Sequence, residues 1–339
     1  AYQDELRSRP CGLAAQITLT FEDGSSKILS TDESWKVSDG PVRFSEIYDG
    51  EIYDSAKTPL LDQSVTMFDG PTDTLILQQG EEVCEQERLA VKKVFVTPNG
   101  ETVLDFGQNM TGYVELFVNA KAGDCVDLSF AEVMDKEGNF YTENYRGAKA
   151  QYHYICSDGV QTWHPSLTFY GFRYIRINDF PGGIDCVKPE NFTAIVVHSN
   201  MKRTGFLSSS NTLLNQLFSN IIWGQKGNFL DVPTDCPQRD ERLGWTGDAQ
   251  VFVRTACLNY DAEKFFTKWL ADLASDQHDD GYVGHVIPDL LQNPHASSAW
   301  GDAAAICPWQ VYLAFGNKQI LKNQYQSMKK WIDYITSTT

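Results

Sequence analysis

The hydrophobic periodicity of this chain changes near residue 200, and this change restricts the fold more than any other feature of the sequence. Before it, apolar residues alternate with polar ones, as at Ala15, Ile17, Leu19 and Phe21, which is the two-residue period of a half-buried strand. After it, apolar residues recur every three or four positions, as in an amphipathic helix. The sequence therefore predicts β structure followed by α structure.

Short strands separated by turn signals account for most of the first part. Asp23-Gly24-Ser25, for example, predicts a hairpin turn between two strands. We expect strands near residues 15–21, 26–30, 91–96, 103–106, 113–119, 125–133, 152–156, 172–177 and 193–197. Many short strands at this spacing are typical of β-sandwiches. We therefore predict two jelly-roll-like β-sandwich domains, at residues 1–60 and 61–199.

Five helical patterns follow residue 200. Their apolar stripes lie at residues 213–222, 249–257, 265–273, 302–315 and 320–335. We expect Asp261 to cap the third helix, Pro308 to kink or restart the fourth, and Gly316 to end it. The predicted helical domain covers residues 200–339.

Residues 231–250, DVPTDCPQRDERLGWTGDAQ, join the first two helical patterns and lack regular periodicity for most of their length. Long loops of this kind are usually functional or disordered. Cys236, Leu243 and Trp245 favour order, because such side chains need burial or a stacking partner. The segment also concentrates carboxylates and two arginines. Its charged residues are Asp231, Asp235, Arg239, Asp240, Glu241, Arg242 and Asp248.

This charge pattern fits two different roles. Cleavage of a glycoside needs a carboxylic acid that protonates the leaving oxygen, and crowding by other carboxylates raises the pKa of such an acid. Arg239 and Arg242 would balance the crowded charges, and Trp245 offers a flat apolar face to a sugar ring. The alternative is a network of salt bridges that only holds the loop against its helices. The residues by themselves leave both readings open.

The run PTDCPQRDERLGWTGDAQ resembles the signature of the bacterial α-L-rhamnosidases, glycoside hydrolase family 78. Other segments agree with this resemblance. LDFGQNMTGYVELFV at 104–118 and FYGFRYIRI at 169–177 are similar to the middle β-sandwich of the family, and residues 21–55 to its N-terminal sandwich. SSAWGDAAAICPW at 297–309 resembles a later part of the helical domain. The resemblance covers most of the chain.

The resemblance implies a catalytic (α/α)6 barrel and an inverting mechanism that releases terminal L-rhamnose from rhamnose-containing glycosides, without a cofactor. By position in the motif, Glu241 is the general acid. The positions that contact rhamnose or support the acid are Asp235, Arg239, Trp245, Asp248, Trp300 and Asp302. Asp240 and Arg242 flank Glu241 and are expected to point away from the sugar, since neighbours in an extended segment face opposite sides.

Length predicts an incomplete barrel. Twelve helices of ~12 residues with their loops need roughly 250 to 350 residues, and about 140 follow residue 199. We therefore expect a truncated chain that is inactive because its general base lies beyond Thr339. Asp279, Asp280 and Asp289 are the substitutes within the chain, but their context gives them no support. Apolar helix faces left exposed would favour self-association.

Composition excludes several other classes of protein. The net charge of −17 argues against nucleic acid and anionic membrane surfaces as partners. No apolar run approaches the ~18 residues of a membrane span, and the compartment stays open between cytoplasm and periplasm. The eight cysteines form no CxxC pair and the histidines no metal-ligand spacing, so we expect free, mostly buried thiols and no metal site.

Two alternative functions remain. The sandwiches could form a sugar-binding module without catalysis, or the helical domain could belong to a related (α/α)6 enzyme that acts on another sugar. Glu132, Asn144, Arg146 and His164 lie in the sandwich segments that resemble the family. We expect them to have structural roles, as polar ties between the sandwich and the helices.

Overall fold

The computed structural model describes residues 12–70, 75–291 and 296–338. It contains two compact units, of which the first comprises Ala1–Val42 and Lys57–Gln78 and the second Arg43–Ala56 and Gln79–Thr339. Among the described residues, no helix has the length and apolar character needed to cross a membrane.

The first unit contains two small antiparallel sheets within its described residues. β1 (Gln16–Thr20) pairs with β2 (Ser26–Ser30), and β3 (Lys36–Val37) pairs with β6 (Gln63–Ser64). The predicted turn between β1 and β2 forms as expected. Asp23 Oδ1 accepts hydrogen bonds from both the backbone nitrogen and the hydroxyl of Ser25, while Gly24 takes a φ of +81°. A short polar side chain and a glycine thus fix this turn.

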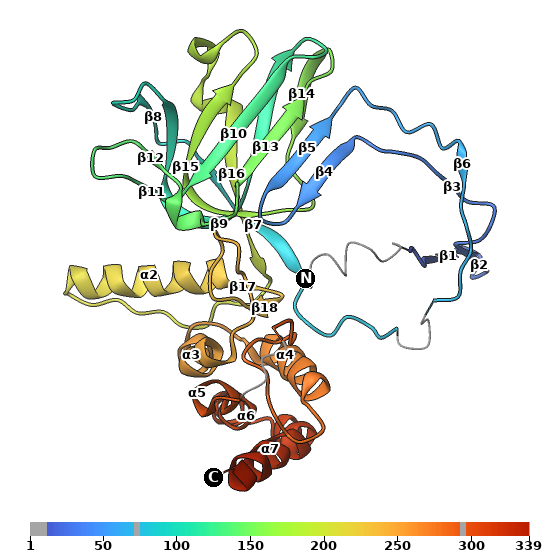
Figure 1. Cartoon of the computed structure of the whole chain (residues 1–339), viewed down its shortest axis with the longest axis vertical. Helices are drawn as coiled ribbons and strands as arrows, with labels where there is room; N and C mark the ends of the chain where they lie inside the picture. Colours follow the sequence, from blue (N-terminus) through green and yellow to red (C-terminus); the bar gives the residue numbers. More distant parts are fainter. Residues whose placement is uncertain (1–11, 71–74, 292–295, 339) are drawn as a thin grey trace. The chain divides into compact units, whose positions relative to one another are not determined.

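The second unit begins with a ten-stranded sheet that folds over itself as a sandwich (Figure 1). Its strands are β4 (Val42–Glu46), β5 (Gly50–Asp54), β7 (Val83–Ala90), β8 (Lys93–Val96), β9 (Thr102–Ala120), β10 (Cys125–Ala131), β13 (Gln151–Ile155), β14 (Gly159–Trp163), β15 (Tyr170–Asp179) and β16 (Phe192–Ser199). They pair in the order β4-β5-β13-β10-β15-β9-β16-β7, and β8 and β14 also pair with β9. β5 and β13 run parallel. The strands predicted from sequence in this region are confirmed.

The long strand β9 holds this sheet together because it changes partners along its length. Its first part pairs with β15 and its last part with β16 and β14. The change occurs at Gly112, where an added Cβ would lie 1.8 Å from the carbonyl oxygen of Ile195. Only glycine allows two strands to approach so closely. The residues predicted as two strands, 103–106 and 113–119, therefore form one.

Two observations concern the predicted domain limits at residues 60 and 199. β4 and β5 belong to the sheet of the second unit, which groups residues 43–56 with the later strands. β16 ends at Ser199, and helical structure begins at Thr212. The limits of 1–60, 61–199 and 200–339 stay predictions.

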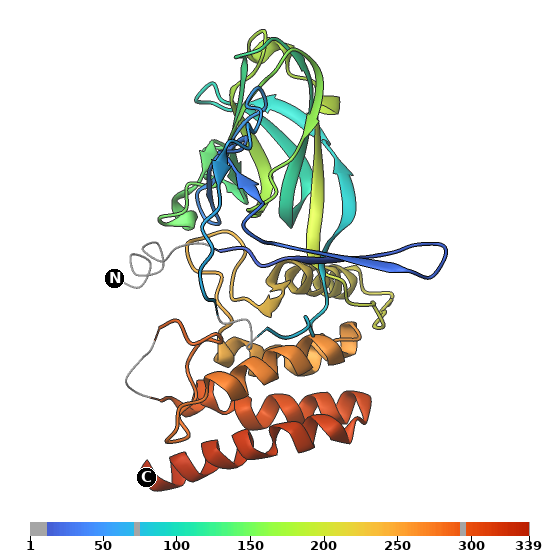
Figure 2. The same cartoon turned by 90° about the vertical axis from the view of Figure 1, so that its right-hand side faces the viewer.

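The helical part of the second unit follows the sandwich. Its helices are α2 (Thr212–Asn228), α3 (Thr246–Asn259), α4 (Glu263–Asp276), α5 (Ser298–Gly301), α6 (Ala303–Phe315) and α7 (Lys318–Thr338). Figure 2 shows α4, α6 and α7 stacked in layers. They share one buried core, in which Phe265, Phe266, Trp269 and Trp331 are almost completely enclosed. This core confirms the last four predicted helical stripes, whereas most of the stripe at 213–222 lies outside it.

Three details of the predicted helix ends can be compared with the structure. Gly316 ends α6 in the left-handed conformation, as expected. α6 runs through Pro308, so this proline is not a helix boundary. The prediction that Asp261 caps α4 is wrong. The N-cap residue is Ala262, without a side-chain cap, because the backbone of Asp261 is held by a hydrogen bond to Lys202.

α2 presents an apolar face that no described residue covers. Leu213 is 79% exposed and Leu217 54% exposed. Val251 and Leu258 on α3 are exposed as well. Exposed apolar helix faces were expected, although they lie on early helices as well as on the last ones. Self-association through these faces stays a prediction.

The described cysteines are all free, and they follow the expectation of buried thiols only in part. Cys156, Cys236, Cys257 and Cys307 are buried, whereas the other three described cysteines are half-buried or exposed. Cys11 lies outside the described residues.

Candidate functional site

The segment between α2 and α3 is an ordered loop whose ends are fixed by the backbone. It opens with a small hairpin of β17 (Phe229–Leu230) and β18 (Val232–Pro233). The backbone nitrogen and the hydroxyl of Thr234 both donate to the carbonyl of Asn228. At the other end, Trp245 forms a β-bridge with Val286 and immediately precedes α3. The loop is therefore held in one shape, as the burial of its apolar residues requires.

Arg242 anchors the loop to the sandwich. Its side chain is buried and donates to the carbonyl oxygens of Ile47 and Phe169, both at 2.8 Å, and to two carbonyls of the loop itself. The guanidinium also lies over the rings of Tyr48 and Phe169. Arg242 thus points away from Glu241, as predicted, and ties the loop to the sandwich.

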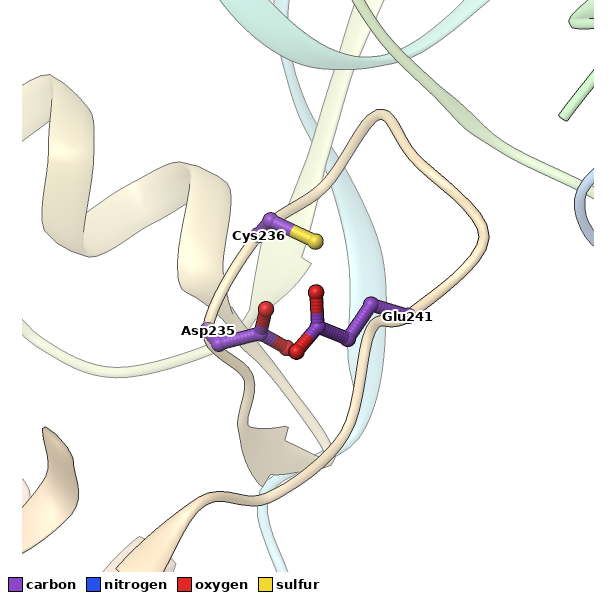
Figure 3. A group of neighbouring side chains, drawn as sticks. All are labelled: Asp235, Cys236 and Glu241. Atoms are coloured by element: carbon purple, nitrogen blue, oxygen red, sulfur yellow. The ribbon is translucent and has the colours of Figure 1, made fainter. Parts of the chain in front are cut away.

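The carboxylates of Asp235 and Glu241 face each other inside the loop (Figure 3), and Arg239 bonds to both. Arg239 Nε donates to Glu241 Oε2 at 2.7 Å, and Arg239 Nη2 donates to Asp235 Oδ2 at 2.9 Å. The second oxygen of Asp235 accepts the backbone N–H of Leu243 at 3.0 Å. Asp235 is buried, with 6% of its side chain exposed, whereas Glu241 keeps 20%. Asp235 therefore orients Arg239, and Glu241 is the more accessible carboxylate.

The sandwich contributes two further groups to this network. Arg146 Nη2 donates to the same Glu241 Oε2 at 2.9 Å, and Arg146 Nε donates to Asp240 Oδ1 at 2.8 Å. The Tyr48 hydroxyl donates to the backbone carbonyl of Glu241 at 2.8 Å. Arg146 has a φ of +55°, which is unfavourable for a residue with a Cβ. Its two ion pairs offset that cost and connect the sandwich to the loop.

The environments of Glu241 and Asp235 shift their pKa values in opposite directions. Burial raises the pKa of Glu241, but the hydrogen bonds and charges of Arg239 and Arg146 outweigh it, so the net shift is downward. The pKa of Asp235 is raised, chiefly because the carboxyl is buried. Crowding by carboxylates was expected to raise the pKa of the acid. For Glu241 that expectation is wrong, because two guanidinium groups bond to the same carboxyl oxygen and lower its pKa.

Removal of Arg146 should raise the pKa of Glu241. The variant Arg146→Gln deletes one of the two cations that favour the ionised carboxylate. We expect an upward shift in a ¹³C NMR titration of the glutamate carboxyl groups. The control is Arg88→Gln, which removes an ion pair with Glu115 elsewhere in the sandwich. An unchanged Glu241 pKa would show that Arg239 alone sets it.

The lowered pKa of Glu241 also determines how pH changes the stability of the fold. Because the folded-state pKa of Glu241 lies below its ordinary value, its ion pairs stabilise the fold above that ordinary value. This contribution is lost as the pH falls through the folded-state pKa. In Arg146→Gln the contribution is smaller and its loss is complete at a higher pH, which acid-denaturation curves would register.

Cys236 lies beside the two carboxylates. Single ligand atoms of Asp235, Cys236 and Glu241 lie within 4.8 Å of one another. Burial is the main cause that raises the pKa of the Cys236 thiol to about 11, so the thiol stays neutral near pH 7. Arg239 already bonds to both carboxylates. A guanidinium thus supplies the positive charge at the centre of this cluster.

The remaining predicted site residues lie around the start of α3. The Trp300 indole packs directly on Gly247, where an added Cβ would lie 3.0 Å from its ring. Trp245 and Trp300 each bury an indole N–H that has no hydrogen-bond partner among the described residues. Asp248 is exposed in the first turn of α3. These three residues therefore gather at one helix end.

The side chain of Asp302 contacts helix α7. Its Oδ1 accepts a hydrogen bond from Trp331 Nε1 on α7 at 2.9 Å. Gly301, the residue before it, also faces the Trp331 ring. These contacts connect Asp302 to the helical core. A role for Asp302 in contacting a sugar stays a prediction.

Sequence reasoning missed Tyr48 and undervalued Arg146. Both come from segments far from the loop, 193 and 95 positions before Glu241. No local pattern marks them, since their contacts depend on how the sandwich meets the helices. Arg146 is a polar tie between the two, as expected, and it also touches the candidate acid. His164 stacks on Tyr113 within the sandwich.

Comparison with known proteins gives a consistent set of relatives. Residues 202–339 match the sequence model of the bacterial alpha-L-rhamnosidase 6 hairpin glycosidase domain. Residues 95–198 match that of the bacterial alpha-L-rhamnosidase concanavalin-like domain, and residues 2–92 that of the alpha-L-rhamnosidase N-terminal domain. An alpha-L-rhamnosidase of Formosa agariphila is 38% identical over 96% of this chain, which spans 36% of that relative.

Two crystal structures show the same arrangement. The alpha-L-rhamnosidase of Aspergillus terreus has a TM-score of 0.89 and 40% identity, covering 94% of this chain and 38% of its own. The alpha-L-rhamnosidase of Streptomyces avermitilis, complexed with L-rhamnose, has a TM-score of 0.87 and 36% identity. That alignment covers 96% of this chain and 33% of the Streptomyces chain. The predicted order of sheet-rich domains followed by a six-hairpin helical domain is thereby confirmed.

Proposed function

The chain belongs to the bacterial α-L-rhamnosidases, glycoside hydrolase family 78, and from this premise we propose that it carries the proton-donating half of a site that releases terminal α-L-rhamnose. Glu241 is the proposed general acid. The substrates are rhamnose-containing glycosides, and the reaction is hydrolysis with inversion.

The position of Glu241 is the observation that carries this proposal. Both arginines bond to its Oε2, while Oε1 has no hydrogen-bond partner within residues 12–70, 75–291 and 296–338. The side chain is partly exposed. One carboxyl oxygen is thus fixed and the other is available, which is the geometry that a proton donor to a glycosidic oxygen needs.

The lowered pKa of Glu241 restricts how the acid can work. A carboxylate that pairs with two guanidinium groups is ionised near pH 7 and has no proton to give. We propose that a bound substrate displaces the half-exposed Arg146 side chain from Oε2. The pKa of Glu241 then rises, its carboxylate takes up a proton from solvent water, and this proton passes to the oxygen that leaves the sugar.

Asp235 and the tryptophans complete the proposed site. Asp235 is buried and holds Arg239, so we assign it to positioning rather than to proton transfer. Trp245 and Trp300 supply apolar faces and two N–H groups that no described residue accepts, and these suit the C–H face and the hydroxyl groups of a sugar. Asp248 and Asp302 are the remaining proposed contacts.

Inversion also needs a second carboxylate, roughly 6.5 to 9.5 Å from the acid, that activates water. Asp289 pairs with His278 at 2.9 Å, which fits a structural role. No observation supports Asp279 or Asp280 as the base. We therefore propose that this 339-residue chain does not turn over an aryl α-L-rhamnoside by itself. Robust turnover by the chain would show that one of these aspartates, or another group in it, acts as the base.

Rhamnose binding tests the site without requiring turnover. Calorimetric titration of the chain with L-rhamnose should show binding that Trp245→Ala weakens by about tenfold, because a buried aromatic wall contributes ~1 to 2 kcal/mol. The control is Trp309→Ala, which alters a half-exposed tryptophan of α6. Equal binding by the chain and by the Trp245→Ala and Glu241→Gln variants would mean that the loop is not the sugar site.

The two alternative functions lead to different expected binding results for these variants. A sugar-binding sandwich without catalysis would keep its affinity in both loop variants. A related enzyme with another sugar preference would bind a different monosaccharide at the loop, and that binding would still depend on Trp245. A panel of monosaccharides, titrated against the same variants, separates the three cases.

A further inference from the structure

A cavity of about 300 Å³ lies between the sandwich and α2, and none of the proposed catalytic or rhamnose-contacting residues lines it. Gln108 and Asn109 of β9 and the neighbouring Glu132 form one wall. Asn220, Trp223 and Asn228 of α2 form the other wall. Its volume is at the lower end of the range found for small-molecule sites. It therefore has room for a compact ligand.

The polar groups of this cavity are mostly uncharged. Four of its side chains are amides, and each amide offers both a donor and an acceptor. Among the described residues that line the cavity, Glu132 is the one carboxylate and none is a lysine or an arginine. Phosphate, sulfate or uronate ligands need cationic partners, which this lining lacks. The lining instead suits a neutral ligand with many hydroxyl groups.

The walls are fixed before any ligand arrives. Glu132 accepts hydrogen bonds from Asn109 at 3.1 Å and from Asn144 at 3.2 Å. Trp223 packs against the sandwich core, and Lys226 lies over its ring. Asn228 buries a side-chain oxygen that no described residue bonds to. A buried acceptor without a partner is costly unless a ligand or a water molecule supplies one.

We propose that this cavity is a second carbohydrate site, which binds one neutral pyranose unit. An indole wall with converging amide and carboxylate groups matches the apolar face and the hydroxyl groups of such a ring. The proposal does not depend on the activity proposed above, since the cavity and the Glu241 network share no lining side chain. It also gives Glu132 and Asn144 a role beyond the structural one expected from the sequence.

Gly224 provides a direct way to fill the cavity. It lies in α2 and lines the cavity, and an added Cβ there would meet no atom within 4 Å. Leucine is also a better helix former than glycine. The variant Gly224→Leu should therefore fold normally while its side chain occupies the ligand space. Gly227 cannot serve, because a Cβ there would lie 2.9 Å from the Thr111 hydroxyl.

The test is a titration of the 339-residue chain with methyl β-D-glucopyranoside, methyl α-D-galactopyranoside and methyl α-D-mannopyranoside, which leaves out the rhamnoside expected at the loop. Saturation-transfer NMR should detect binding of at least one of them, and Gly224→Leu should weaken it by about tenfold or more. Ser219→Leu adds the same side chain at an exposed α2 position outside the cavity and should leave the affinity unchanged. Trp245→Ala should also leave it unchanged, which separates the cavity from the loop.

One further variant and two charged sugars complete the test. Asn220→Ala removes one amide from the exposed rim of the cavity and should weaken binding several-fold, which keeps the proposal testable if Gly224→Leu misfolds. Glucuronate and glucosamine should bind more weakly than the neutral sugars. The proposal is overturned if no neutral pyranoside binds at tens of millimolar, if binding survives Gly224→Leu, or if glucuronate or glucosamine binds best.

Discussion

Replacement of Glu241 by glutamine should lower kcat for an alkyl α-L-rhamnoside by about 10² to 10⁴-fold. The measurement uses a hybrid protein in which this chain replaces the matching part of one of its relatives. Glutamine keeps the size of the side chain and can still accept from Arg239 and Arg146, but it carries no acidic proton. The loss therefore reports on proton transfer rather than on the shape of the loop.

The dependence on the leaving group separates these two causes. A nitrophenolate leaves without being protonated, so nitrophenyl α-L-rhamnoside should lose far less activity in Glu241→Gln than an alkyl rhamnoside. Glu190→Gln, at an exposed position of the sandwich, is the control and should leave both rates unchanged. Equal losses for both substrates would mean that Glu241 supports the loop and does not donate the proton.

Replacement of Arg242 by alanine should lower the free energy of unfolding by about 3 kcal/mol, because buried carbonyl oxygens lose charged donors. Those oxygens belong to Ile47, Phe169, Gln238 and Arg239. Urea denaturation followed by tryptophan fluorescence measures the change. Arg242→Lys should recover only part of the loss, since lysine cannot reproduce the planar fork.

Arg254→Ala provides the matched control. Arg254 lies exposed on α3, so its removal should change stability by no more than about 0.5 kcal/mol. Similar losses in Arg242→Ala and Arg254→Ala would contradict the anchoring role. In that case the sandwich and the loop would be held together by Arg146 and Tyr48 instead.

Secondary structure could be predicted from the sequence because its signals are local. Alternating residues such as Ile17 and Leu19 and stripes such as Phe265, Phe266 and Trp269 report the repeat of the backbone itself. The cap of α4 was predicted wrongly for the opposite reason. Which residue caps a helix depends on where its backbone bonds, and the N–H of Asp261 bonds to Lys202, 59 positions earlier.

The candidate site could be located from the sequence but not described. One short loop contains Asp235, Arg239 and Glu241, so their encounter needs little more than loop closure. The direction of the Glu241 pKa shift was predicted wrongly, because the sequence does not show that Arg146 bonds to the same oxygen. The cavity at α2 had no signal in the sequence, since its two walls come from segments about 90 to 120 positions apart.

The sequence by itself determined the order of β and α structure and the segment in which the charged groups gather, because both depend on neighbours along the chain. The tertiary structure decided which cation faces which carboxylate, which glycine allows β9 and β16 to touch, and where a cavity remains. Those outcomes depend on distances through space, and electrostatic and packing energies change steeply over a few ångströms.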